Sequence, residues 1–114
     1  MPAHSTSAIL RRAAETIEDP ERFSMHYTAA TTPERNRGVV ACLPSADVAE
    51  RWSAMGAIWR ELRNSKMADV RQAHHYFAST VAGGRALGSW CLATNQEQQV
   101  EALRAAANRL AEAA

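Results

Sequence analysis

The sequence has little of several residue types that define whole classes of protein. Its two cysteines, Cys42 and Cys91, are too few for a disulfide scaffold, which favours a reducing compartment with free thiols. No run approaches the roughly 18 apolar residues of a membrane span. The first residues, Met1 to Ser5, lack the basic start and apolar stretch of a signal peptide. We therefore expect a cytoplasmic protein with no membrane association.

An excess of charge of one sign is also missing. The 13 basic residues balance 12 acidic ones, and the formal net charge is +1. This balance removes the electrostatic argument for nucleic acid as an obligatory partner, because binding to phosphates needs a concentrated positive field. Lysine occurs once, as Lys66, beside 12 arginines and 24 alanines. The codons of alanine and most codons of arginine are GC-rich, so we expect an actinobacterial or phage source.

Large side chains are scarce. Aromatic residues make up 6% of the chain, and about half of the residues counted as hydrophobic are alanine. A length of 114 residues is typical of one domain with one core, so residues 1–114 are expected to form a single domain. An alanine-rich core of this size requires helices that pack closely.

Apolar spacing predicts four helices. An apolar residue at every third or fourth position marks one buried face in each of them. This inner face comprises Leu10, Ala13, Ala14 and Ile17 in the first helix and Val100, Leu103, Ala107 and Leu110 in the last. Pro20 should end the first helix, Ser45 is the expected N-cap of the second, and Thr94 and Glu97 form the expected capping box of the fourth. Gly88 to Trp90 is expected to be a turn or a short irregular helix. The predicted helices span residues 7–18, 45–63, 67–81 and 94–114.

The predicted helix 45–63 has the bulkiest apolar stripe. Gly56 lies beside this stripe, where a small residue lets another backbone approach. The resulting close contact would offset the cost of glycine in helix propensity, which is about 1 kcal/mol relative to alanine. We interpret Trp52 as a core anchor. The stripe comprises Val48, Trp52, Met55, Trp59 and Leu62.

A change of period between the first two helices predicts one small β-hairpin. Apolar and polar residues alternate from Phe23 to Ala30, residues 33–38 carry turn chemistry, and Val39 to Leu43 is β-prone. A lone hairpin is marginally stable in water, so its apolar face should lie on the helices. The expected fold class is mainly α, with about four helices and one small β-hairpin packed on them.

Soft-metal ligands and thiols give no recognisable site. A set of His26, Cys42, His74 or His75, and Cys91 can be imagined, but no spacing typical of zinc is present. His74 and His75 point about 100° apart on a helix, so both cannot chelate from one face. Neither cysteine has the signature of a nucleophile. We predict no catalytic, cofactor-binding or metal-ligating residue, and a metal- or thiol-dependent enzyme stays an alternative.

Three segments resemble a family of small uncharacterised domains found in actinobacteria and their phages. They are residues 9–18, residues 51–58 with the motif from Trp52 to Ala57, and Trp90 followed by the alanine-rich residues 99–106. In that family the motif usually runs Trp-Cys-Ala-x-Gly-Ala, and Asn-Asp usually follows the late tryptophan. Here Ser53 replaces the cysteine, and Cys91 and Leu92 replace the Asn-Asp pair. The resemblance implies a fold and a source but no reaction.

The predicted function is that of a small non-enzymatic domain that binds a protein. Tryptophan and arginine dominate the energetics of protein interfaces, and they meet near the end of the predicted helix 45–63. The expected protein-binding residues are Trp59, Arg60, Arg63 and Trp90. The partner is expected to be a protein such as a host factor, and the alanine-rich helix faces leave a homodimer open.

A small nucleic-acid-binding regulator is the alternative from another class. Two predicted helices between residues 45 and 77 suggest a comparison with helix-turn-helix proteins, but both are long and their connection lacks the usual glycine. Arg60, Arg63, Lys66 and Arg71 could form a modest basic patch. The balanced charge favours a solvated helix face instead.

Overall fold

The computed structural model describes residues 2–24, 28–30, 42–47, 49–81, 83 and 86–113. Within these residues the chain is mainly α-helical with one two-stranded antiparallel sheet, which confirms the predicted fold class. None of the helices in these ranges is both long enough and apolar enough to cross a bilayer. The elements are α1 (Pro2–Glu18), η1 (Pro20–Arg22), β1 (Ala29–Ala30), β2 (Arg51–Trp52), α2 (Ala54–Arg60), η2 (Glu61–Arg63), α3 (Met67–Val81), α4 (Leu87–Leu92) and α5 (Gln96–Ala113).

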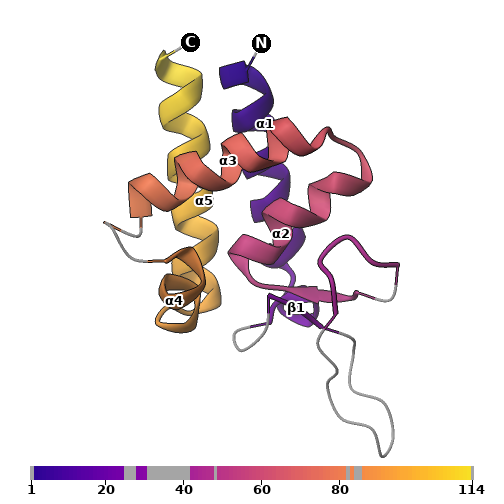
Figure 1. Ribbon diagram of the computed structural model, residues 1–114. Coiled ribbons are helices and arrows are strands. Elements are labelled where there is room, and N and C mark those ends of the chain that lie inside the picture. The colour runs from indigo at the N-terminus through magenta and orange to yellow at the C-terminus, as the bar shows by residue number, and fades with distance from the viewer. Residues whose placement is uncertain are drawn as a thin grey trace, which may run out of the picture.

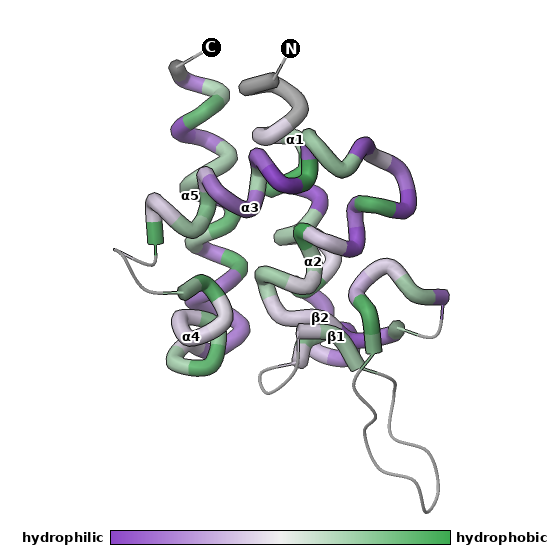
Figure 2. Tube along the Cα trace, in the orientation of Figure 1, coloured by the Kyte–Doolittle hydropathy of each residue, from purple (hydrophilic) through white to green (hydrophobic). Residues whose placement is uncertain are grey.

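The first and last helices lie side by side and run in opposite directions (Figure 1). Near one end of the pair, the Ser7 hydroxyl donates to the carbonyl of Ala107 at 3.0 Å. At the other end, the Gln96 amide donates to the carbonyl of Ile17 at 2.8 Å and so satisfies the C-terminus of α1. The helices α2 and α3 lie across this pair (Figure 1). Hydrophilic and hydrophobic residues alternate along α5, as Figure 2 shows, because one face is buried.

The core lies where α1, α2, α3 and α5 meet. All four residues of the predicted inner face of α1, namely Leu10, Ala13, Ala14 and Ile17, are buried. The predicted inner face of α5 is also confirmed, with Val100, Leu103 and Ala107 buried and Leu110 packed against the cluster. The largest fully buried side chains of the described residues include Phe77, Ile9, Leu10, Ile17, Ile58 and Leu103.

The second helix begins later than the sequence predicts. Ser53, not Ser45, is the N-cap of α2, and its hydroxyl accepts a hydrogen bond from the Gly56 amide at 3.2 Å. Residues 44–47 form a turn. Two long-range interactions outweigh the local helix propensity: β2 pairs with β1, and the Trp52 indole donates to the carbonyl of Pro44 at 2.9 Å. The prediction of a helix from Ser45 is therefore wrong over its first part.

The buried face of α2 also differs from the predicted stripe. The smaller residues Ala54, Gly56, Ala57 and Ile58 are buried, whereas Met55, Trp59 and Leu62 are half-buried at its flank. The backbone of α2 lies so close to its neighbours that only compact side chains fit beneath it. Trp52 is buried as predicted, but it projects from β2. Val48 lies outside the described residues.

Gly56 confirms the predicted close approach of another backbone. A Cβ atom at this position would lie 1.7 Å from the carbonyl oxygen of Thr28, far inside van der Waals contact. The same Thr28 oxygen accepts a hydrogen bond from the Ser53 amide at 3.2 Å. The approaching backbone is thus the segment that leads into β1, which can reach the sheet only because residue 56 has no side chain.

The strand β1 pairs with β2 in the register Ala29 with Trp52 and Ala30 with Arg51. Its predicted hairpin partner, residues 39–43, lies mostly outside the described residues. The part that is described approaches β1, because the Cys42 amide donates to the carbonyl of Ala29 at 3.1 Å. An isolated parallel bridge joins Phe23 to Trp52, so two segments of the chain meet at β2.

The remaining helix ends follow known capping chemistry. The helix α3 has the predicted bounds, and Gly83 follows it with a φ of 55°, a conformation that favours glycine. The short helix α4 contains residues 88–90, where a turn or a short irregular helix was expected. The capping box of α5 is shifted by one residue: Asn95 and Gln98 exchange hydrogen bonds of 2.8 and 2.9 Å, whereas the Thr94 hydroxyl donates to the carbonyl of Trp90.

Candidate functional site

Trp52 forms an aromatic platform for two of the predicted interface residues. The guanidinium carbon of Arg60 lies 4.8 Å from the centre of the indole ring, and that of Arg63 lies 5.7 Å from it. Both distances permit a cation–π interaction. The two arginines are three residues apart at the end of α2 and in η2, so they project from one side of the helix.

Arg63 also holds the turn of residues 44–47 in place. Its guanidinium donates to the carbonyl oxygens of Ser45 and Ala46. Because Trp52 donates to the carbonyl of Pro44, three successive carbonyls of this turn accept hydrogen bonds from the platform and its arginine. The turn that replaces the predicted start of the helix is therefore part of this site.

Arg60 lies among positive charges. Burial lowers the pKa of its guanidinium, and the nearby charges of Arg63 and Arg22 lower it further, while Glu61 acts in the opposite direction. Glu61 is 2% exposed and forms an ion pair with Arg12 at 2.6 Å. The carboxylate of the adjacent residue Glu61 is therefore already neutralised by another arginine.

Two concave regions meet at this point. The larger has a volume of about 560 Å3 and includes Arg22, Arg51, Trp52 and Arg60 in its lining. The smaller, of about 240 Å3, also includes Arg22 and Arg60. Three carboxylates line the larger region as well. These carboxylates belong to Asp19, Glu21 and Glu50. We call Arg22, Arg51, Arg60 and Arg63 the arginine cluster.

Two nitrogen atoms of the arginine cluster have no hydrogen-bond partner. The Nε atoms of Arg51 and Arg60 are both buried and both unsatisfied. The ion pairs found within the described residues are Arg12 with Glu61 and Arg104 with Glu18, so none of them involves the arginine cluster. A buried donor without a partner is costly, and it marks a place where an acceptor would be stabilised.

The two predicted tryptophans of the interface pack against α3. The Trp59 indole donates to Nδ1 of His74 at 2.9 Å, and the Trp90 ring meets the Phe77 ring edge-on at a centroid distance of 5.6 Å. Both tryptophans are half-buried. The structure thus brings Arg60 and Arg63 together on Trp52, while Trp59 and Trp90 each contact a different residue of α3.

Sequence reasoning missed three members of this site. Trp52 was predicted to be a core residue only, and Arg22 and Arg51 were not singled out. Arg22 follows the stop of the first helix at Pro20, and Arg51 lies within a segment that the sequence predicts as helical. The sequence offered one hint of their role, which is that Arg51 directly precedes Trp52.

The thiols are not activated. Burial raises the pKa of the Cys91 thiol, although hydrogen bonds from Met55, Ser53 and Ala54 act in the opposite direction. Burial also raises the pKa of Cys42. A raised pKa keeps a thiol protonated and weakly nucleophilic. In the described part of the chain no three potential ligands gather around a metal position, and His26 lies outside that part.

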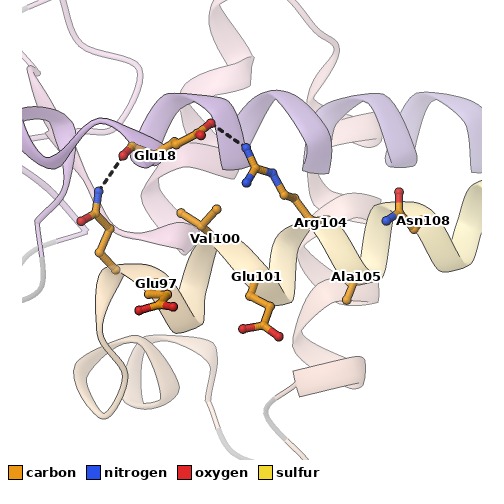
Figure 3. Close-up of a pocket in the computed structure, with 8 residues that line it drawn as sticks. Glu18, Glu97, Val100, Glu101, Arg104, Ala105 and Asn108 are labelled. Carbon is orange, nitrogen blue, oxygen red and sulfur yellow. Dashed lines mark hydrogen bonds and ion pairs between the residues drawn. The ribbon is translucent and has the colours of Figure 1, made fainter.

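A third concave region lies along α5 and includes Glu18 of α1 in its lining. Figure 3 shows Val100 and Arg104 pointing toward α1, while Glu97 and Glu101 point to the other side of α5. Arg104 forms an ion pair with Glu18 at 2.6 Å, and both side chains are about half exposed, so this pair contributes little to stability. The charged groups Glu18 and Arg104 in this region are thus already paired, whereas the Nε atoms of Arg51 and Arg60 are not.

These features define the class of protein as a small, mainly α domain with arginines gathered on a tryptophan platform. The chain belongs to DUF6197, a family of unknown function, whose sequence profile matches residues 1–109. This match confirms the expected relation to a family of uncharacterised domains. Searches among curated proteins and among solved structures found no match.

Proposed function

We propose that this protein is a non-enzymatic interaction domain that binds an acidic segment of a partner protein. The observation that carries the proposal is the stacking of Arg60 and Arg63 on Trp52 without a carboxylate partner for Arg60. Arginine and tryptophan are the residue types most enriched among interface hot spots. The centre of the proposed surface is therefore the arginine cluster, supported from beneath by the buried Trp52 ring.

Preorganisation supports this assignment. A free arginine loses side-chain entropy when it binds, whereas a guanidinium already stacked on an indole loses less. Arg63 is further fixed by the carbonyls of Ser45 and Ala46. Carboxylates are the complementary groups, because a guanidinium binds them through two parallel hydrogen bonds.

The source and location of the protein belong to the same proposal. We infer an actinobacterial or phage origin from the excess of arginine over lysine and the high alanine content. We further infer that the protein acts in the cytoplasm, on a protein of the host cell. Two unpaired cysteines support a reducing compartment.

Selection of displayed random peptides on the immobilised full chain tests the function. The proposal expects enrichment of sequences rich in Asp and Glu. A double variant with Arg60→Lys and Arg63→Lys should bind the selected peptides at least tenfold more weakly, because lysine keeps the charge but cannot form the two parallel hydrogen bonds of a guanidinium. The matched control is Arg71→Lys with Arg109→Lys, two exposed arginines on α3 and α5, and it should retain affinity.

Two outcomes would contradict the proposal. Peptides selected without acidic residues, or bound equally by both double variants, would place the surface elsewhere. Tighter binding to duplex DNA than to any peptide, with a steep loss of affinity as salt rises, would favour the nucleic-acid alternative.

A further inference from the structure

We propose that the concave region between Arg22, Arg51 and Arg60 is a phosphate-binding site that receives a phosphorylated side chain of the partner. This inference rests on the proposed function and names the ligand of its central region. The three arginines come from η1, β2 and α2, so the site exists only in the folded chain. The region has a volume of about 560 Å3, and Trp52 lies in its lining.

The unsatisfied donors are the first argument for a ligand. The Nε atoms of Arg51 and Arg60 are shielded from solvent and have no acceptor. Stacking on Trp52 explains the position of Arg60 but leaves its Nε without a hydrogen bond. An oxyanion in the concave region that both side chains line would offer several acceptor atoms to their guanidinium groups.

The nearby carboxylates do not fill this role. The Asp19 carboxylate accepts a hydrogen bond from the Glu21 amide at 2.9 Å, as the N-cap of η1. Glu50 has an interaction of its own. Glu61, in the adjoining smaller region, is paired with Arg12. Glu21 is an exposed carboxylate in the lining of the site, as are Asp19 and Glu50, and it should oppose an incoming anion.

The charge around Arg60 favours phosphate over a single carboxylate. Arg60 lies near enough to Arg22 and Arg63 for their charges to disfavour its own. A phosphate monoester carries a charge of about −1.5 to −2 near neutral pH and three acceptor oxygens, so one group can neutralise more of this repulsion than a carboxylate can. Arginine clusters are a recurring solution for binding phosphorylated side chains.

Titration of the full chain with inorganic phosphate, at constant ionic strength, tests the site. The Nε–H signals of the arginines are followed by NMR, with acetate as the comparison ligand. We expect saturable shifts of the Arg51 and Arg60 signals with phosphate and weaker, non-saturating shifts with acetate. Shifts that do not saturate, or that are equal for both anions, would overturn the proposal.

Three variants separate binding from nonspecific charge effects. Arg22→Gln removes an exposed arginine that lines both concave regions and should weaken phosphate binding at least tenfold without unfolding the chain. Arg71→Gln, the control on α3, should leave the affinity unchanged. Glu21→Gln should tighten binding, a change that a purely structural role of these residues does not produce. Equal effects of Arg22→Gln and Arg71→Gln would contradict the site.

Matched peptides then identify the source of the phosphate. An acidic peptide selected as described above is prepared with serine, glutamate or phosphoserine at one central position. The inference expects the phosphoserine form to bind at least tenfold more tightly than the other two. Equal binding of all three would overturn the phosphate site and leave the proposed function intact. Binding of inorganic phosphate, but of no peptide, would instead overturn the protein partner.

Discussion

The indole N–H of Trp59 donates to Nδ1 of His74 at 2.9 Å, and this bond requires that His74 be neutral. Burial lowers the pKa of His74, and the neighbouring His75 lowers it further. In the unfolded chain the pKa returns to about 6.5. The bond joins α2 to α3, so the protonation state of one histidine is coupled to the packing of two helices.

Stability should therefore fall in mildly acidic solution. Because the folded pKa of His74 is the lower one, the unfolded state binds more protons as the pH drops below about 6.5, and the free energy of unfolding decreases until the folded pKa is reached. Urea denaturation between about pH 8 and pH 5 measures this loss. His74→Gln, which can still accept from Trp59, should flatten the profile, whereas His75→Gln should retain most of the slope. An unchanged profile in His74→Gln would assign the loss to other groups.

Gly56→Ala should destabilise the protein although alanine is the better helix former. The new methyl group would meet the carbonyl of Thr28, which is backbone and cannot rotate away. We expect a loss of about 3 kcal/mol, at the upper end of the cost of overpacking. Gly88→Ala is the matched control, because its Cβ would lie 3.6 Å from Met55, an ordinary contact. Thermal denaturation of both variants decides the point, and equal melting temperatures would refute the close approach.

Trp52→Ala should destabilise the fold by about 3 to 5 kcal/mol, as expected for truncation of a buried aromatic residue. Trp52→Phe is the more conservative variant. It keeps a ring beneath Arg60 but loses the hydrogen bond to Pro44, so we expect a smaller loss of about 1 to 3 kcal/mol. Chemical denaturation measures both losses. If the two variants were equally stable, the ring would not be the element that supports the arginines.

Gln99 is a polar residue at the centre of the core, and its replacement should be costly. Its side chain is 0% exposed; it accepts from the Ala54 amide and donates to the carbonyls of Cys91 and Thr94. Gln99→Leu leaves the Ala54 amide and the Thr94 carbonyl without these hydrogen bonds, whereas the Cys91 carbonyl still accepts from the Thr94 amide. We expect a loss of at least about 2 kcal/mol, since each unsatisfied group costs about 1 to 3 kcal/mol. Gln98→Ala removes only an exposed cap and should cost about 1 kcal/mol. Faster hydrogen exchange at Ala54 in the Leu variant would locate the effect at the start of α2.

Local periodicity was sufficient to predict α1, α3 and α5, because their buried faces repeat within the helix itself. It was insufficient at residues 45–52. There a helix-compatible sequence is held in a turn and a strand by Ala29, Ala30 and the Trp52 contact with Pro44, which are tertiary interactions. The later part of the same segment, from Ala54, is helical as expected.

The candidate site also contains residues that local sequence spacing groups together and residues that only the tertiary structure brings together. Arg60 and Arg63 could be predicted together because helical spacing places them on one side. Arg22 and Arg51 could not be joined to them, since their proximity depends on the path of the chain through η1 and β2. Gln99 was missed for a related reason: its partners lie on α2 and near the end of α4, and no sequence spacing indicates them.

The pairing of α1 with α5 sets the order in which the chain can mature on the ribosome. Ser7 and Ala107, joined by a hydrogen bond, are separated by 100 positions. The part of the apolar face of α1 that packs on α5 therefore stays uncovered until α5 has been synthesised, and contacts of such long sequence separation slow folding relative to helical bundles of local connectivity. The start of α1 and the end of α5 lie at the same end of the molecule (Figure 1), so the pairing of these helices brings the two ends of the chain together.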